Sequence, residues 1–184
     1  MTRITIVIIY LVLTVSAQCS TKVTIWLEYT DPGQHYTVLY PSIARPEFSK
    51  DVRPGLLSQT AFVFDQKLEN PKSGSSVSFS LQISIWDNPR RLDASEWAKV
   101  HTNPKLTSVA RTVTVSQLRA YMVRTTDLLT WTVNIFVSQA NKVYQISYLD
   151  VISMDLSTKA LSKFRWKAIV DKIVESFQVQ SARG

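Results

Sequence analysis

The sequence SVSFSLQISIW at residues 76–86 has an apolar side chain at every second position. Val77, Phe79, Leu81, Ile83 and Ile85 alternate with serines and a glutamine. Because successive side chains of a β-strand point to opposite faces, this pattern predicts a strand with one buried face. The alternation is typical of an antiparallel sheet, since parallel strands are usually apolar on both faces.

Stretches on both sides of this strand predict the rest of the sheet. Residues 23–29 and 35–40 flank Asp31, Pro32 and Gly33, which predicts a hairpin. We expect residues 42–59 to form a surface loop, because they mix prolines with charges of both signs. Further strands are predicted at residues 61–65, 111–115, 119–125, 130–138 and 142–149. The last two are expected to pair through a turn at Asn141 and Lys142.

Two helices are predicted beside these strands. Asp93 is the expected N-cap of the first, because Glu96 three residues later completes a capping box and Leu92 can pack on Trp97. This helix is expected to end before the proline at 104. Residues 157–177 predict a C-terminal helix, with an apolar stripe that lies across the sheet. The stripe is formed by Trp166, Ile169, Val170, Ile173, Val174 and Phe177.

Length and composition are consistent with one globular domain. The chain has 184 residues, of which 45% are hydrophobic and 19% charged, so it can bury a core without disulfides. The predicted fold class is therefore α+β, a central antiparallel β-sheet flanked by helices in an α/β/α sandwich. We assign residues 20–184 to this single domain and expect it to be monomeric.

The first nineteen residues have the organisation of a secretory signal peptide. Arg3 precedes twelve apolar residues at 4–15, and the small residues Ser16 and Ala17 follow. This run is too short for a lasting transmembrane helix, which needs about 20 apolar residues. Cleavage after Ala17 is one interpretation, and lipid attachment at Cys19 is the other. Both predict an exported protein, either secreted, periplasmic or lipid-anchored to the membrane.

The sequence lacks the residue clusters that most catalytic or cofactor sites require. A single cysteine and two histidines cannot form the common zinc or disulfide patterns. Only four glycines are present, and none forms a phosphate-binding loop or a nucleophile elbow. We therefore predict no enzyme activity, cofactor or metal. A scattered Ser/His/Asp hydrolase site using His35 or His101 remains an alternative.

A second alternative is a small-ligand carrier. Its cleft would lie between the sheet and the loop at residues 42–59, beside Trp26, Trp86 or Trp131. We rank this alternative below a binding module.

Basic residues give the best indication of a contact surface. The net charge is +7, which favours acidic partners. Because export argues against nucleic acid, we expect an anionic membrane surface or a protein partner. The predicted contact residues are Arg90, Arg91, Lys99, Lys105, Arg111, Arg119 and Arg124.

Four short motifs resemble the PsbP-like family. They are YTVLYP at 36–41, SEWA at 95–98, KVYQISY at 142–148 and VESFQ at 174–178. That family includes extrinsic photosystem subunits, bacterial envelope lipoproteins and a nuclear-transport cofactor that binds a small GTPase. The resemblance implies a helix-flanked antiparallel sheet and usually no catalysis, and it identifies no functional residues in this chain. We therefore expect an exported accessory module of the cell envelope that engages a membrane complex or another exported protein.

Overall fold

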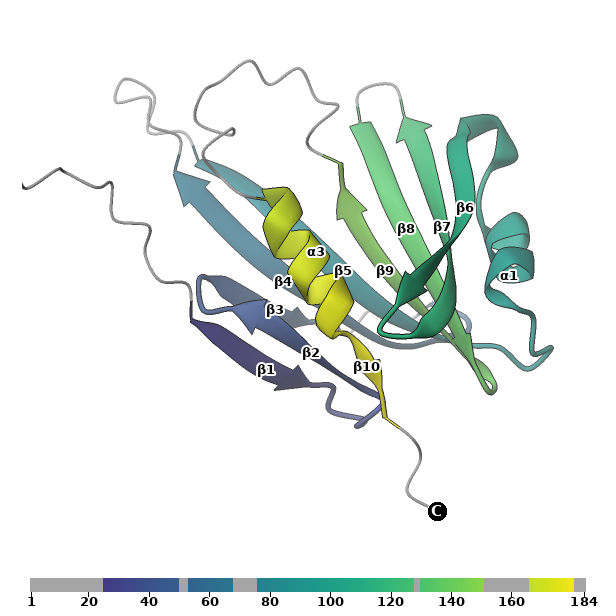
Figure 1. Ribbon diagram of the computed structural model, residues 1–184, viewed down its shortest axis with the longest axis horizontal. Helices are drawn as coiled ribbons and strands as arrows, with labels where there is room; N and C mark the ends of the chain where they lie inside the picture. The colour runs from purple at the N-terminus through teal and green to yellow at the C-terminus, as the bar shows by residue number, and fades with distance from the viewer. Residues whose placement is uncertain (1–24, 50–52, 68–75, 128–129, 151–165, 181–184) are drawn as a thin grey trace, which may run out of the picture.

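A computed structural model of the chain describes residues 25–49, 53–67, 76–127, 130–150 and 166–180 (Figure 1). Within these ranges, ten strands form two antiparallel sheets, accompanied by two α-helices and one short 3-10 helix. The predicted antiparallel sheet with helices on its faces is confirmed. The fold is nevertheless mainly β, because a second, smaller sheet that the sequence analysis did not predict shares one face with the C-terminal helix.

The larger sheet has seven strands, and every neighbouring pair is antiparallel. Strand β5 lies near its middle, where Ile83 is opposite Thr60 on one neighbour and Ile146 on the other. In spatial order the strands are β3 (Ala44–Phe48), β4 (Leu56–Lys67), β5 (Ser76–Asp87), β9 (Lys142–Leu149), β8 (Thr130–Gln139), β7 (Leu118–Asp127) and β6 (Thr107–Val115).

One face of this sheet carries the main core. Phe79, Leu81, Ile83 and Ile85 are all buried there, as the alternation predicts, and the side chain of Val77 lies outside the described part of the chain. Helix α3 (Trp166–Ser176) covers this face, as Figure 1 shows. It buries three residues of the predicted stripe, Trp166, Val170 and Ile173, and residues 157–165 of the predicted helix lie outside the described residues.

The smaller sheet lies beside α3 on the same face. It consists of β1 (Trp26–Thr30), β2 (Tyr36–Pro41) and β10 (Gln178–Val179), with β2 in the centre. The predicted hairpin at residues 23–40 is confirmed as the β1–β2 pair. Tyr36 and Val38 of β2 are fully buried against the core of the larger sheet.

Helix α1 (Ala94–His101) covers part of the opposite face. Its capping box is confirmed, because the backbone N–H groups of Ser95 and Glu96 donate to Asp93 Oδ1 at 2.8 Å and the Asp93 N–H donates to Glu96 Oε2 at 2.9 Å. Trp97 packs with Leu92 in a second core cluster. The 3-10 helix η1 (Pro104–Leu106) then leads into β6.

The prediction of a loop at residues 42–59 is wrong. This region contains β3 and the beginning of β4, which is much longer than the strand predicted at 61–65. Pro46 is compatible with β3 because this strand lies at the edge of the sheet, where a missing N–H breaks no interior ladder.

The predicted signal segment, with Cys19 and the cleavage position after Ala17, lies outside the described residues. Among the helices that the structure describes, none combines the length and apolar character needed to cross a bilayer.

Candidate binding site

The seven predicted basic residues separate into three groups in the structure. Arg91, Lys99 and Arg119 line one cavity, and Arg111 and Arg124 line another. Arg90, in the turn before α1, and Lys105, in η1, are exposed and line neither cavity.

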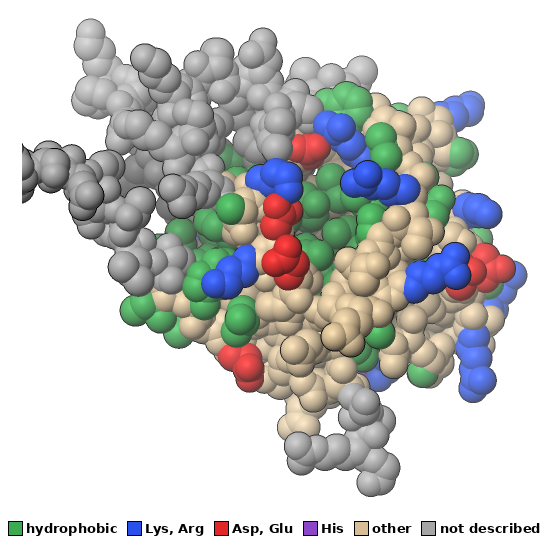
Figure 2. All heavy atoms as spheres, viewed as in Figure 1, with side chains coloured by type: hydrophobic (Ala, Val, Ile, Leu, Met, Phe, Trp, Pro, Cys, Tyr) green, Lys and Arg blue, Asp and Glu red, His purple; other side chains and the backbone are tan. Residues whose placement is uncertain are grey.

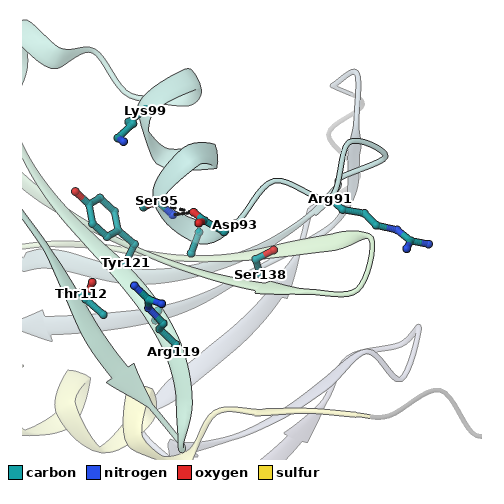
Figure 3. A pocket seen from close by; sticks show the side chains of 10 residues that line it. Arg91, Asp93, Ser95, Lys99, Thr112, Arg119, Tyr121 and Ser138 are labelled. Carbon is teal, nitrogen blue, oxygen red and sulfur yellow. Dashed lines mark hydrogen bonds between the residues drawn. The ribbon is translucent and has the colours of Figure 1, made fainter.

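The first cavity lies between α1 and the hairpin formed by β6 and β7, and we call it the basic cavity. Its volume is about 400 Å³. Figure 3 shows Arg119 extending from β7 toward the start of α1, and Lys99 projecting from the helix on the other side. Arg91 points away from both in the same view. The cations available to a ligand inside the cavity are therefore Lys99 and Arg119.

Strand register places these groups together. Tyr121 of β7 is opposite Thr112 of β6, and Arg119 is opposite Thr114, so all four side chains lie on the face that carries α1. On the helix, Ser95 and Lys99 are four residues apart and therefore share one side. Hydroxyl groups from Ser95, Thr112 and Tyr121 thus line the space between the two cations.

The carboxylate of Asp93 also lines the basic cavity, and one of its oxygens is engaged by the helix. Oδ1 accepts the N–H groups of Ser95 and Glu96 and also the Ser95 hydroxyl. Hydrogen bonds from the Glu96 backbone, then from the Ser95 side chain, lower the pKa of Asp93. The positive charge of Arg119 contributes to the same lowering.

Lys99 and Arg119 form no ion pair within the described part of the chain. Arg124 differs, because its guanidinium lies 2.9 Å from Asp150 Oδ2 and 4.3 Å from the ring centroid of Trp131. The positive charge of Arg124 is therefore already matched inside the protein, whereas the charges of Lys99 and Arg119 can attract an external anion.

The second cavity is lined mainly by apolar side chains, and we call it the apolar cavity. Its volume is about 430 Å³, and it lies between α3 and the β6–β7 hairpin. Figure 2 shows it as a hollow with hydrophobic side chains inside and charged side chains around the rim. The apolar lining comes from Val109, Met122, Val133, Leu149, Trp166 and Val170.

The sequence analysis identified the cations of the basic cavity but missed its hydroxyl groups. Thr112 and Tyr121 are separated by nine positions, and only the β6–β7 pairing brings them together. The short gap between the strands predicted at 111–115 and 119–125 was the one available signal for their proximity.

The structure contains part of the geometry that the hydrolase alternative requires, namely a histidine beside an aspartate. His35 Nδ1 lies 2.8 Å from Asp31 Oδ2, as in a catalytic dyad. Ser58, however, donates to the other oxygen of Asp31 at 2.8 Å instead of to the imidazole. Gly33 N also donates to Asp31 Oδ2 at 3.0 Å. In the described residues no hydroxyl is hydrogen-bonded to the His35 ring, and the hydrogen bonds of Asp31 hold the β1–β2 turn.

His101 is also part of the local structure. Its ring stacks on Trp97 with a centroid distance of 3.9 Å, and its Nδ1 atom lies 2.9 Å from the Trp97 carbonyl oxygen. The structure therefore places both histidines in helix or turn interactions. No cluster of three metal-binding side chains occurs in the described ranges.

The carrier alternative loses its expected cleft, because residues 44–48 and 56–59 of the predicted loop are strands of the larger sheet itself. The three tryptophan rings are covered by cations of the same chain. Arg53 lies 5.4 Å from the ring centroid of Trp86, and Lys172 lies 4.3 Å from that of Trp26. Trp131 is covered by Arg124 as described above.

Comparison with known proteins gives a likeness of fold. No protein-family model matches the sequence, and no curated protein is significantly similar to it. Among solved structures, cyanobacterial PsbP from Synechocystis sp. PCC 6803 superimposes with a TM-score of 0.52 over 88% of this chain and 96% of that protein, at 12% identity. The chain has the PsbP-like fold.

Two further structures share this fold. The Ran-binding protein Mog1p of Saccharomyces cerevisiae matches 85% of this chain and 96% of its own, with a TM-score of 0.50 and 16% identity. A protein from Bacteroides thetaiotaomicron VPI-5482 also has a TM-score of 0.50, with 12% identity over 85% of this chain. The chain spans only 49% of that protein. At these identities the PsbP-like fold is established and a shared activity is not implied.

Proposed function

We propose that this chain is a non-catalytic accessory module, exported to the cell envelope, that binds an acidic protein partner at the basic cavity. The observation that carries the proposal is that Lys99 and Arg119 line this cavity and form no ion pair with a described residue. The one carboxylate in the lining, that of Asp93, also serves as the N-cap of α1, so the cavity needs further negative charge to balance its cations. Carboxylates of a partner would supply that charge and would also accept hydrogen bonds from the neighbouring hydroxyls.

Two other facts support this function. Mog1p, which has the same fold, is described as a Ran-binding protein, so the PsbP-like fold is compatible with binding another protein. The apolar run at residues 4–15 after Arg3 supports export. The intact mass of the protein from its native membrane tests the export step. A chain acylated at Cys19 and a chain cleaved after Ala17 have different masses, and both differ in mass from the unprocessed chain.

Binding at the basic cavity is tested by charge reversal. The full-length chain and its Lys99→Glu/Arg119→Glu variant are compared in cross-linking pull-downs from the native envelope fraction. We expect the double variant to recover the partner about tenfold less well, because two attractive contacts become repulsive.

The matched control is Arg45→Glu, which reverses one exposed charge on β3, at the other edge of the larger sheet. It is expected to recover the partner normally. Equal recovery by the double variant would contradict the proposal. Recovery that depends on anionic lipid vesicles alone would indicate a membrane surface in place of a protein partner.

A further inference from the structure

The two edges of the seven-stranded sheet differ in their capacity to accept another strand. Edge strand β3 has five residues, and its centre is Pro46, which has no N–H to donate. Arg45 and Glu47 add charges beside it. Short length, proline and charge are the usual means of blocking pairing at a sheet edge.

Strand β6 lacks this protection along most of its length. It has nine residues and no proline, and residues 108–112 are all exposed. Its pairing with β7 is regular from Val109 to Val115, after one irregularity at its start. The other side of β6 has no neighbouring strand within the described residues, so its outward backbone groups can pair with an added chain.

A different cavity lies beside each face of β6. Thr112, on the face toward α1, lines the basic cavity with Arg119. Val109 and Arg111, on the opposite face, line the apolar cavity with Met122 and Trp166. Neighbouring strands lie about 4.8 Å apart and their side chains alternate between faces. Half of the side chains of a strand added to β6 would therefore point toward the basic cavity. The other half, which alternate with them, would point toward the apolar cavity.

We infer that β6 binds an extended segment of a partner protein in which acidic and apolar residues alternate. The acidic side chains lie on the α1 face, where Lys99 and Arg119 provide the complementary charge. The apolar side chains lie on the α3 face, toward Met122 and Trp166. This inference rests on the proposed function and adds the shape and sequence pattern of the bound segment. Backbone pairing provides affinity in such strand additions, and the side-chain sites provide specificity.

The test uses the full-length chain and the synthetic peptide acetyl-EVEIEVEI-amide. Calorimetry measures affinity, and amide hydrogen exchange followed by NMR locates the contact. We expect binding with slower exchange along β6 and unchanged exchange along β3. Two further peptides carry N-methyl groups, one on its Glu residues and the other on its Val and Ile residues. Because only one of these sets directs its N–H groups toward β6, we expect one of the two peptides to bind about ten times more weakly or worse.

Two controls separate charge from strand pairing. The peptide EEEEVVII has the same composition without alternation and is expected to bind more weakly than the alternating peptide. Arg119→Glu is expected to weaken binding of the alternating peptide, whereas Arg45→Glu leaves it unchanged.

The outcomes distinguish this inference from the proposed function. Equal affinity of the N-methylated and unmodified peptides, with NMR changes at Lys99 and Arg119, would overturn strand addition and leave the basic cavity as a binding site. Absence of binding by every acidic peptide would overturn both. Exchange protection along β3 or β1, or self-association of the chain through β6, would also overturn the inference.

Discussion

The two faces of strand β5 show different ways of stabilising one sheet. Toward α3, Leu81, Ile83 and Ile85 are fully buried among other apolar side chains. On the opposite face, Gln82 Nε2 donates to Ser84 Oγ at 3.0 Å, and Trp86 Nε1 donates to a glutamine of β9. The first face depends on the volume that its side chains fill, whereas the second depends on polar groups finding partners.

The polar face extends across several strands. Gln145 of β9 accepts the Trp86 indole N–H at 2.9 Å and donates to Asn134 Oδ1 at 2.9 Å. Ser147 donates to the same Asn134 oxygen at 2.7 Å. These hydrogen bonds between side chains link the polar residues of β5, β9 and β8 on the face that α1 covers only in part.

Removing volume from the apolar face is expected to have the largest effect. Ile83→Ala should lower the free energy of unfolding by about 3 kcal/mol, because it leaves a cavity in a close-packed core. Chemical denaturation measures the change, and Ile83→Val should cost about 1 kcal/mol. An Ile83→Ala loss below that of Ile83→Val would show that this face is not close-packed.

Removing a partner from the polar face is expected to cost less. Gln145→Ala leaves the Trp86 N–H and the Asn134 carbonyl without their shared partner, and we expect a loss of about 1.5 kcal/mol. Denaturation of the variant is compared with that of Gln139→Ala, an exposed position at the end of β8. Equal stability of the two variants would mean that water replaces Gln145 at no cost.

The helix on the polar face depends on its cap. Asp93→Ala should destabilise the protein by about 1 kcal/mol, because two backbone N–H groups of the first turn lose their acceptor. Asp93→Asn keeps an acceptor and is the matched control. If thermal unfolding shows the two variants to be equally destabilised, the charge and not the hydrogen bonds accounts for the effect.

The smallest expected effect is the pH dependence of this cap. The pKa of Asp93 is below its ordinary value of 3.8 because the Glu96 backbone and Ser95 donate to the carboxylate. A carboxyl group with a lower pKa in the folded state stabilises the protein above its unfolded pKa, and this contribution is lost as pH falls through the folded pKa. The stability difference between wild type and Asp93→Asn should therefore be constant from about pH 7 to 5 and shrink below about pH 4. A difference that instead grows on acidification would contradict this assignment.

Elements with a strong local pattern could be predicted from the sequence. The alternation at residues 76–86 and the capping box at Asp93 depend on neighbouring residues alone, and both are confirmed. Strand β3 could not be recognised in the same way. Its residues ARPEF contain two charges and a proline and show no apolar alternation, and they form a strand only because β4 offers a partner at an edge.

Local sequence was also not enough to define the candidate site. Charge and composition identified Lys99 and Arg119 as contact residues, but whether a cation is already paired depends on distant segments. Arg124 pairs with Asp150 across 26 positions of sequence, and nothing local distinguishes it from Arg119. The β6 edge was also underestimated, because residues 107–110 do not alternate and the strand was predicted to begin at 111.

The smaller sheet has a consequence for the order in which the chain can fold. Strand β2 receives its second neighbour only from residues 178 and 179, and Leu39 N–H bonds to Ser176 Oγ, 137 positions later. Such long closures are slow because chain entropy is lost before contacts form. Strand β2 therefore keeps one unpaired side until residues 178 and 179 reach it, and the smaller sheet is complete only once that late segment has docked.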